Sequence, residues 1–472
     1  MEATKKKRKE LNPFVIVFVV IFACWVATYL IPGGAYDRVE ENGVVSVVAD
    51  SYHAVDKEPL SVFDLFLSIP QGMVMSAGLM ALVFLTTGAI GVFNKTGALT
   101  VGMSHLMGGV YKRFGSEKGA PIVLFCVMLI FAVLGGVLGW IEGGIPFIPL
   151  FIPLILALGY DSMVAIASTA LVMMIGFAYC PINVYTVGIA HDIAGLPMFS
   201  GMGYRVVVLV TCLAITMAYI FRYAAKVKAD PSRSLVKDVD MTGLVDKDVA
   251  TSETKKLNTT QKLVLLILAA TIGVVVYGCT KYAWGYEPIT AAFFIGGTAA
   301  GLISRLTPGE IADIYIAGAK DSVDAAMIIG TASGVSWILE QGGLIDPIVH
   351  ATATPLSHLP PWAAAIGVFI VVTLLNGLVA GGSTKALILM PLLVPIADIT
   401  GITRQTVTQA FQFGDGISNS FWITYGTLLI FLSLGRIPIG KWWKFVVPLL
   451  ASLSVIAIIG LVIAVKINYG PF

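Results

Sequence analysis

The chain has 472 residues, of which 57% are hydrophobic and 12% are charged, and its formal net charge is +2. Soluble globular proteins carry about 25% charged residues, so this chain has too little polar surface to stay in water. These values exclude a cytosolic enzyme and a disordered protein, and the absence of a dominant basic face excludes a nucleic-acid-binding protein. A multi-pass membrane protein remains.

The N-terminal segment predicts the orientation of the chain. A basic run at residues 5–9 precedes an apolar stretch at residues 14–32, which is long enough to cross a bilayer of about 30 Å and has no clear cleavage site. We therefore expect residues 1–33 to form a cytoplasmic basic N-terminus and a first transmembrane helix in the cytoplasmic (inner) membrane. The acidic segment 34–59 is then an extracytoplasmic loop.

The body of the chain divides into two halves at the polar segment 225–261, whose excess of Lys and Arg predicts a cytoplasmic linker. Segment 98–114 is weakly amphipathic and is expected along the cytoplasmic interface. Several apolar segments of the second half are too short to span a bilayer. The other predicted helices are 73–93, 119–139, 146–158, 162–180, 203–224, 262–280, 287–303, 322–339, 362–380, 386–397, 402–414, 427–435 and 443–465.

The two halves share an ordered series of motifs. PLFIP (149–153) and PLLVP (391–395), with the glycine that follows each, align without a gap, and CPINVYT (180–186) parallels GISNSFWIT (416–424). Interrupted apolar segments at matching positions of two halves are typical of transporters built from repeats. We expect an all-α polytopic membrane protein with two inverted-topology repeats, each with a re-entrant helical hairpin and a broken transmembrane helix. The repeats span 60–224 and 262–472, with hairpins near 119–158 and 362–397.

The breaks predict where ligands bind. Gly-rich turns at 143–144 and 381–384 lie at the two hairpin tips, and the helices break at 181–183 and 416–419. Unwound backbone at membrane depth is tolerated only where protein or a water-filled cavity covers it. Free N–H groups at a helix start suit an anionic group, and free carbonyls suit a cation such as Na⁺. Two tips and two breaks predict one cavity for substrate and ion.

Three stretches of the sequence resemble a known family. The stretches are GGVLGWIEGGIPFIPLFIPLILALGYD (135–161), NVYTVGIAHDIAGLP (183–197) and STKALILMPLLVPIADITGITRQTVTQAFQFGDGISN (383–419). They resemble the YfcC-like branch of the C4-dicarboxylate anaerobic carrier (DcuC) family, within the ion transporter superfamily. The resemblance runs over about residues 10–470 and is most specific over Pro391–Asn419.

This resemblance implies an elevator-type transporter with separate scaffold and transport domains, commonly a homodimer. Related branches carry C4-dicarboxylates, arginine or ornithine, and other small carboxylates, often coupled to Na⁺ or H⁺. Two departures affect the substrate. The branch usually has two adjacent acids at the first tip, where this chain has Glu142 and Gly143, and Ser-Gly-Ser-Gly-Gln at the second, where this chain has Gly381-Gly382-Ser383-Thr384-Lys385.

Two charged residues, Glu142 and Lys385, lie at the predicted hairpin tips, where a bare charge costs about 2.5–3.5 kcal/mol on insertion scales. Glu142 requires a substrate cation, a proton or a lysine; its structural alternative is a salt bridge to a neighbouring helix. Lys385 is expected to bind a substrate carboxylate, to pair with Glu142 or to extend outward. Together they predict a clamp for a zwitterion, which favours an amino acid over a dicarboxylate.

Neutral oxygens and amides beside the breaks complete the candidate site, with helix capping and interhelical bonding as their alternative role. Asp415, just before the second break, is expected to balance a Na⁺ or carry a proton. The predicted substrate-binding residues are Glu142, Gly143, Gly144, Asn183, Tyr185, Thr186, Gly382, Ser383, Thr384, Lys385, Asn419 and Thr424. The predicted ion-coupling residues are Asn183, Ser383, Asp415, Ser418 and Asn419.

The expected function is secondary active transport of a small carboxylate-bearing metabolite. The sequence has no phosphate-binding loop for an ATP-driven pump and no GxSxG or HExxH motif of an enzyme. We expect no cofactor beyond a coupling Na⁺ or H⁺, no structural metal, and partners limited to substrate, lipid and a second copy of the chain. Three alternatives stay open: an amino-acid transporter, an ion-coupled C4-dicarboxylate carrier and a transporter-like sensor.

Overall fold

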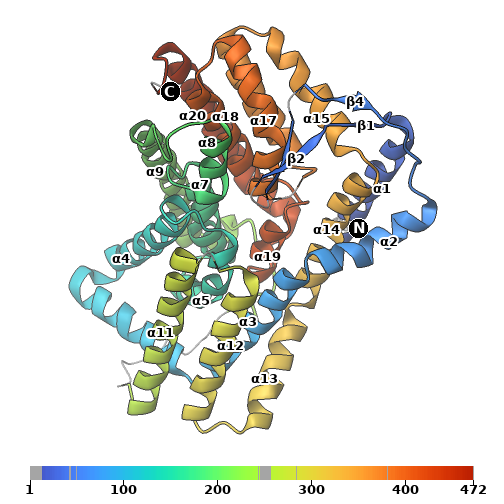
Figure 1. The fold of residues 1–472 in the computed structure, drawn as a ribbon. Coiled ribbons are helices and arrows are strands. Elements are labelled where there is room, and N and C mark those ends of the chain that lie inside the picture. The colour runs from blue at the N-terminus through green and yellow to red at the C-terminus, as the bar shows by residue number, and fades with distance from the viewer. Residues whose placement is uncertain are drawn as a thin grey trace, which may run out of the picture.

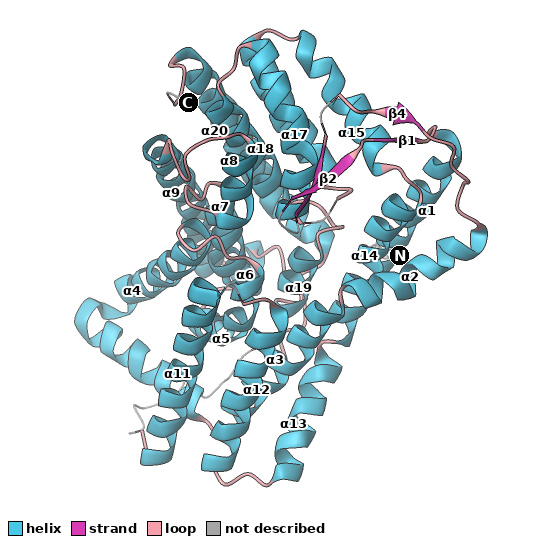
Figure 2. Cartoon of the chain, in the orientation of Figure 1, coloured by secondary structure: helices cyan, strands magenta, loops and turns pink. Residues whose placement is uncertain are grey.

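The computed structural model describes residues 13–41, 44–48, 50–242, 244, 257–282, 284–379 and 381–470. Within these ranges the chain is almost wholly helical, and its short strands are confined to one loop (Figures 1 and 2). The predicted all-α class is therefore confirmed. The basic run at residues 5–9 lies outside the described residues.

The N-terminal segment begins with α1 (Pro13–Leu30), which agrees with the predicted first helix to within two residues. The loop that follows holds two small antiparallel sheets that the acidic composition did not predict. Strand β1 pairs with β4, and β2 pairs with β3, which packs against α17. The strands are β1 (Gly34–Ala35), β2 (Arg38–Glu41), β3 (Val44–Val47) and β4 (His53–Ala54).

The first half contains two local breaks in long apolar helices. The predicted span 73–93 is divided at Ser76 into α2 (Val62–Met75) and α3 (Ala77–Lys95). Helix α4 (Ala98–Gly136) bends at Gly115, whose φ of 75° favours glycine. The remaining elements are η1 (Glu142–Phe147), α5 (Ile148–Ala157), α6 (Ser162–Ile166), η2 (Ala167–Leu171), α7 (Val172–Ala178), η3 (Val184–Gly188), α8 (Ile189–Ile193) and α9 (Met202–Ala229).

The linker is shorter than the predicted 225–261, because α9 continues to Ala229 and the next helix starts at Thr259. Ala and Lys in this stretch favour helix, and Asp230-Pro231 ends it. The later elements are η4 (Pro231–Arg233), α11 (Thr259–Tyr282), α12 (Tyr286–Ile303), α13 (Pro308–Asp321), α14 (Val323–Gln341), α15 (Ile345–Ala353), η5 (Thr354–His358), α16 (Pro361–Leu375), α17 (Gly382–Thr400), α18 (Arg404–Ser418), α19 (Gly426–Leu434) and α20 (Ile439–Lys466).

The order of elements recurs in the two halves. Each half has a helix pair (α2–α3 and α13–α14), a hairpin (the end of α4 with α5, and α16 with α17), a broken helix and a long helix (α9 and α20). The helix pairs of the two halves pack on each other, since α2 contacts α14 and α3 contacts α13 (Figure 1).

The loops that follow the two hairpins lie at opposite ends of α20. The loop after the first hairpin contacts the linker, because Ser234 donates a hydrogen bond to Asp161 (2.6 Å), and Lys441 at the start of α20 pairs with Asp238 of the same linker. The loop after the second hairpin contacts the far end, where Thr403 donates to the carbonyl of Tyr469 (2.7 Å). Helix α20 has 28 residues, about 42 Å at 1.5 Å per residue.

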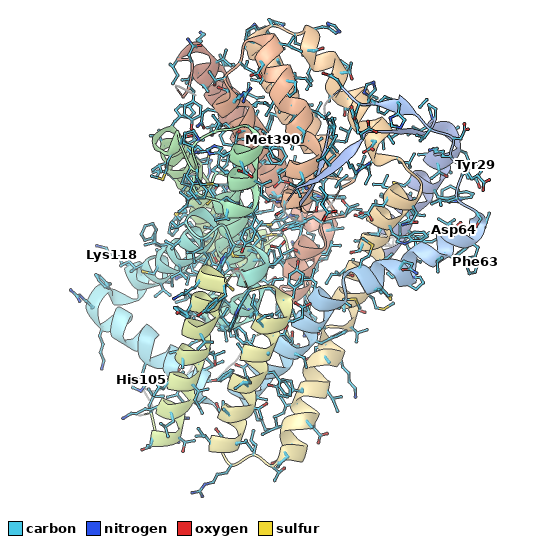
Figure 3. All side chains as sticks on the ribbon, viewed as in Figure 1. Tyr29, Phe63, Asp64, His105, Lys118 and Met390 are labelled. Atoms are coloured by element: carbon cyan, nitrogen blue, oxygen red, sulfur yellow. The ribbon has the colours of Figure 1, made fainter. Side chains whose placement is uncertain are left out.

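Six helices in the described part of the chain are long and apolar enough to cross a membrane, and α13 with α14, bent by 52°, would make a seventh. Large apolar side chains cover the outer surface of these helices, as lipid contact requires. Phe63 on α2 is 72% exposed and lies at the outer edge near Tyr29 of α1 (Figure 3). The protein is therefore a multi-span membrane protein.

Candidate functional site

A central cavity of about 310 Å³ lies where the two hairpin tips meet the two broken helices. The first hairpin contributes Trp140 and Glu142, and the second contributes Gly382 and Ser383. Helices α11 and α12 close the remaining side. The lining residues are Gly139, Trp140, Ile141, Glu142, Gly143, Phe177, Tyr185, Thr186, Cys279, Trp284, Gly285, Tyr286, Ile289, Gly381, Gly382, Ser383, Asp415, Asn419 and Tyr425.

The first hairpin tip is shaped by glycine. Gly139 has a φ of 66°, which turns the chain before Trp140 and Glu142. Gly144 is buried against α7, where an added Cβ would lie 2.2 Å from the Sδ of Met173, so a side chain here would require Met173 to move. Gly143 lines the cavity, whereas Gly144 is not among the lining residues and serves the packing of the tip.

Glu142 is held by hydroxyl groups instead of a basic residue. Its Oε1 accepts hydrogen bonds from the hydroxyls of Tyr425 (2.7 Å) and Thr427 (3.3 Å), both just after the second helix break. Among the described residues, no Lys, Arg or His forms an ion pair with this carboxylate. The salt bridge that the sequence left open for Glu142 is therefore absent from the described structure, and its charge faces the cavity uncompensated.

The second hairpin tip touches the first helix break directly. Gly381 has a φ of 87°, and a Cβ at Gly382 would lie 2.6 Å from the side chain of Thr186. Ser383 donates a hydrogen bond from Oγ to the carbonyl of Tyr185 (2.9 Å). Helix α17 starts here, so its first N–H groups, which have no partner within the helix, lie at the cavity wall.

Lys385 lies behind this tip and not in the cavity. Its Nζ is 2.9 Å from Oδ1 of Asp415, and the two side chains are 2% and 1% exposed. Lys385 lines neither the central cavity nor the second cavity that lies beside it. From the sequence we expected Lys385 to bind a substrate carboxylate, to pair with Glu142 or to extend outward. In the structure it pairs with Asp415 of α18.

The first helix break presents polar groups with unused hydrogen-bonding capacity. Asn183 is buried, and its Oδ1 caps η3 by accepting a hydrogen bond from the N–H of Tyr185 (3.0 Å). Within the described structure, its Nδ2 and the Oγ1 of buried Thr186 have no hydrogen-bond partner. Thr186 and the half-exposed Tyr185 line the cavity, while Asn183 supports them from behind.

The second helix break is tied to its hairpin by Asn376, which the sequence did not single out. The Asn376 amide donates to the carbonyl of Asp415 (2.9 Å), to Oγ of Ser418 (2.7 Å) and to Oδ1 of Asn419 (2.8 Å). Asn419 reaches the cavity and Ser418 does not. Thr424 donates to the carbonyl of Gly377 (2.7 Å), which holds the two segments together.

A second cavity of about 490 Å³ lies beyond Tyr425. It shares four lining residues with the first, namely Glu142, Tyr286, Gly381 and Tyr425, so these residues form the partition between the two spaces. Thr384 and Thr424 line this second cavity. Its far wall carries Arg38 from the N-terminal loop and Glu340 from α14, which makes it a vestibule between the central cavity and that loop.

The structure thus brings most predicted residues to the two cavities. The predicted residues that line the central cavity are Glu142, Gly143, Tyr185, Thr186, Gly382, Ser383, Asp415 and Asn419. Those that line the vestibule are Thr384 and Thr424. The remaining predicted residues line neither cavity and are Gly144, Asn183, Lys385 and Ser418. Sequence analysis missed Tyr425, although it directly follows Thr424 in the break. It also missed Trp284 and Tyr286, which carry no repeat signal because they come from outside the hairpins.

The described residues contain no group of three or more His, Cys, Asp or Glu side chains that could hold a metal ion. The groups that line the central cavity are carboxylates, hydroxyls, an amide, aromatic rings and the start of a helix.

Comparison with known proteins identifies the family. The sequence profile of the C4-dicarboxylate anaerobic carriers matches residues 12–466. The chain belongs to this family. It is therefore a membrane transporter, and the family resemblance expected from the sequence is confirmed.

Two relatives within this carrier family match along almost their whole length. An uncharacterized protein of Haemophilus influenzae is 28% identical over 513 residues, covering 99% of each chain. A protein of Escherichia coli named as the putative basic amino acid antiporter YfcC is 28% identical over 498 residues, covering 97% of each chain.

Two solved structures are also similar to this carrier. The YdaH transporter of Alcanivorax borkumensis matches with a TM-score of 0.42 and 14% identity, over 98% of this chain and all (100%) of that one. MtrF of Neisseria gonorrhoeae, whose structure is described as illuminating a class of antimetabolite efflux pumps, matches with a TM-score of 0.44 and 14% identity, over 98% of each chain.

Proposed function

We propose that this transporter carries a basic amino acid, of the arginine or ornithine class, across the cytoplasmic membrane by exchange. One observation carries the proposal: the central cavity is lined by two carboxylates, Glu142 and Asp415, and by no Lys, Arg or His among the described residues. The name of the Escherichia coli relative, a putative basic amino acid antiporter, points the same way.

The charge balance of the cavity favours a cationic substrate. Asp415 is neutralised by Lys385, which leaves Glu142 as the uncompensated charge in the cavity wall. Two unit charges 4 Å apart interact by about 4 kcal/mol at an effective dielectric constant of 20. A guanidinium or ammonium group would gain this attraction, whereas a C4-dicarboxylate would bring two further negative charges beside Glu142.

The rest of the cavity suits the other parts of an amino acid. The first turn of α17, at Gly382 and Ser383, offers N–H groups and the positive end of a helix dipole to an α-carboxylate. Trp140, Trp284 and Tyr286 offer ring faces, which attract a guanidinium by cation–π interaction. The volume of about 310 Å³ is at the small end of ligand sites, which span about 300–1,000 Å³.

The transport movement belongs to the same proposal. The hairpins and broken helices would move together as a transport domain against α2, α3, α13 and α14 as scaffold, with the Glu142–Tyr425 partition opening toward one side at a time. Support comes from the packing of these four helices on one another and from the two cavities on either side of that partition. We further propose a homodimer, with the N-terminus in the cytoplasm.

The test is counterflow in liposomes loaded with unlabelled L-arginine. We expect uptake of labelled arginine and ornithine, little uptake of citrulline, which has nearly the same shape without the charge, and none of succinate. Glu142→Gln should lower arginine exchange at least tenfold, about 1.4 kcal/mol, because it removes the attraction for the cation.

The matched control is Glu117→Gln, which makes the same chemical change at an exposed position on α4 outside both cavities. It should exchange arginine at the wild-type rate. Succinate uptake with no arginine uptake would contradict the proposal and restore the dicarboxylate carrier. Equal exchange of arginine and citrulline would show that Glu142 does not select for charge.

A further inference from the structure

The ammonium group of Lys385 is enclosed by oxygen atoms at the back of the second hairpin. It donates to the side-chain oxygen of Asn376 and to the carbonyl of Val379 (3.0 Å), and it lies 2.9 Å from Oδ1 of Asp415. An ammonium has three N–H donors. Hydrogen bonds to Asn376 and Val379 use two of them, and the Asp415 carboxylate adds an ion pair without a recorded hydrogen bond. The buried charge is therefore paired as well as hydrogen-bonded.

The three oxygens come from the parts of the fold that interrupt its helices. Asn376 and Val379 lie in the turn between α16 and α17, and Asp415 lies in the last turn of α18 before the break. Asn376 is fixed in place because its amide N–H groups are directed at Asp415, Ser418 and Asn419. Its oxygen is therefore held toward Lys385 whether or not a lysine is present.

This set of ligands is also the set that a small cation takes. A hard cation prefers carboxylate, amide and backbone carbonyl oxygens, and unwound backbone in broken membrane helices supplies such carbonyls. Here one carboxylate, one amide oxygen and one carbonyl surround a single positive charge. The oxygens around Lys385 are thus of the kinds that bind a small cation.

The site is connected to the central cavity through Asp415. One carboxylate oxygen of Asp415 faces Lys385, and the other, Oδ2, lies at Gly382, where an added Cβ would be only 3.0 Å away. Asp415 and Gly382 both line the cavity. The first hairpin has no such lysine, since Gly143, six residues before Pro149, matches Lys385, six residues before Pro391.

We propose that Lys385 is a tethered cation that permanently fills a monovalent-cation site in the second hairpin. It fixes the hairpin to the broken helix in the way a bound ion would, so the cycle needs no dissolved Na⁺ at this position. The inference deepens the proposed transport function and rests on it only for the consequence that exchange is independent of Na⁺. An ordinary buried salt bridge would instead leave no cation site behind when the lysine is removed.

The first experiment measures thermal unfolding of the purified full-length protein in choline, Na⁺, K⁺ or Li⁺ chloride at equal ionic strength. The wild-type melting temperature should be the same in all four salts. Lys385→Ala should melt lower in choline and recover by several degrees, in a saturable manner, in at least one of the small cations, because that ion binds only the folded state.

Two variants serve as controls. Lys385→Ala combined with Asp415→Asn removes the negative ligand and should lose the cation response. Lys441→Ala breaks another Lys–Asp pair, with Asp238 at the membrane surface, and should show none. A Lys385→Ala protein whose melting temperature is the same in every salt would overturn the tethered cation, as would a saturable Na⁺ response of the wild type.

A second measurement covers the case in which Lys385→Ala does not fold in any salt. Wild-type exchange in liposomes should proceed at the same rate when choline replaces Na⁺ on both sides, and a loss of tenfold or more would overturn the inference. The unfolding experiment contains no substrate. A failure of arginine exchange therefore counts against the proposed substrate alone, and a failure of the cation response counts against the tether alone.

Discussion

Single residues decide the charge of this site. Glu142 and Lys385 lie at corresponding hairpin tips, yet their surroundings differ completely. Lys385 has a carboxylate, an amide oxygen and a carbonyl around it, whereas Glu142 has two hydroxyl donors from the other half of the chain. The ammonium is therefore neutralised within the protein, whereas no basic side chain among the described residues pairs with the carboxylate.

Tyr425 is the residue that holds Glu142 toward the cavity. Tyr425→Phe removes the 2.7 Å hydrogen bond and keeps the ring that separates the two cavities. A hydrogen bond to a charged group contributes about 1.5–3 kcal/mol. We expect the KM for arginine exchange in liposomes to rise roughly tenfold or more, with a smaller change in the maximal rate, because the carboxylate loses its fixed position.

The control for this change is Tyr219→Phe, which removes a hydroxyl that donates to the carbonyl of Phe445 (2.7 Å) away from both cavities. Its KM should stay at the wild-type value. If both tyrosine variants behave alike, Tyr425 contributes to general packing and the role assigned to its hydroxyl is wrong.

The charged residues at the two hairpin tips could be predicted from the sequence, but their partners could not. Glu142 and Lys385 were identified because a charge inside an apolar stretch must be stabilised. Tyr425, the partner of Glu142, is 283 residues away in the sequence. Asp415 contacts Lys385 only because the second hairpin packs against α18. Such pairings depend on how separate helices pack on one another, which no local pattern encodes.

The N-terminal loop is an element fixed to the second half of the chain. Arg38 makes two hydrogen bonds to the carboxylate of Asp346 on α15 (2.9 and 3.0 Å), which also accepts the N–H of Tyr36 (3.0 Å). The ring of Tyr52 stacks on His350 at 3.8 Å. Burial and the nearby charge of Asp346 raise the pKa of Tyr36 to about 12, so its hydroxyl, 2.9 Å from Nδ1 of His350, stays protonated at physiological pH.

Asp346 is thus the anchor of the loop that forms the outer wall of the vestibule. Asp346→Asn removes the negative charge that accepts hydrogen bonds from Arg38 and Tyr36, and the loss of this charge-assisted pair should release strands β1 to β4. We expect trypsin to cut after Arg38 or Lys57 several times faster than in the wild-type protein, as measured by mass spectrometry of the fragments.

Asp398→Asn is the matched control, because it breaks the ion pair of Asp398 with Arg404, in which both side chains are more than 40% exposed. Exposed pairs contribute about 0–1 kcal/mol, so cleavage in the loop should not change. Equal cleavage rates in Asp346→Asn and the wild type would mean that the sheets and the Tyr52–His350 stack hold the loop without this carboxylate.

At the scale of elements, the periodic and apolar segments were predictable and the polar ones were not. The predicted second hairpin, near 362–397, is found as α16 and α17 because Gly381 and Gly382 interrupt an otherwise continuous apolar run. The four strands of the loop were missed because each has only two to four residues. They form because the loop packs on α15 and α17. This is a tertiary interaction, which the acidic composition of the loop does not predict.

At the scale of the whole molecule, the linker and the loop that follows the second hairpin lie at opposite ends of α20. Helix α20 runs between them, from the Lys441 contact with the linker to the Tyr469 contact with Thr403. The N-terminal loop packs on α15 and α17 and so belongs with the second hairpin. If the basic N-terminus is cytoplasmic, as the positive-inside rule predicts, the linker shares that side and the second hairpin enters from outside.

Three single cysteines test this arrangement in a variant in which the exposed native Cys126 is replaced by alanine. The positions Asp56 in the N-terminal loop, Lys237 in the linker and Ile399 in the last turn of α17 are all exposed. In intact cells a membrane-impermeant maleimide should label Asp56→Cys and Ile399→Cys, whereas Lys237→Cys should react only after the membrane is opened. Labelling of all three from one side would contradict a chain that crosses the membrane between these positions. Labelling of Lys237→Cys alone in intact cells would keep the fold and reverse its orientation, because the two ends of α20 would still be distinguished but the positive-inside rule would have failed for this chain.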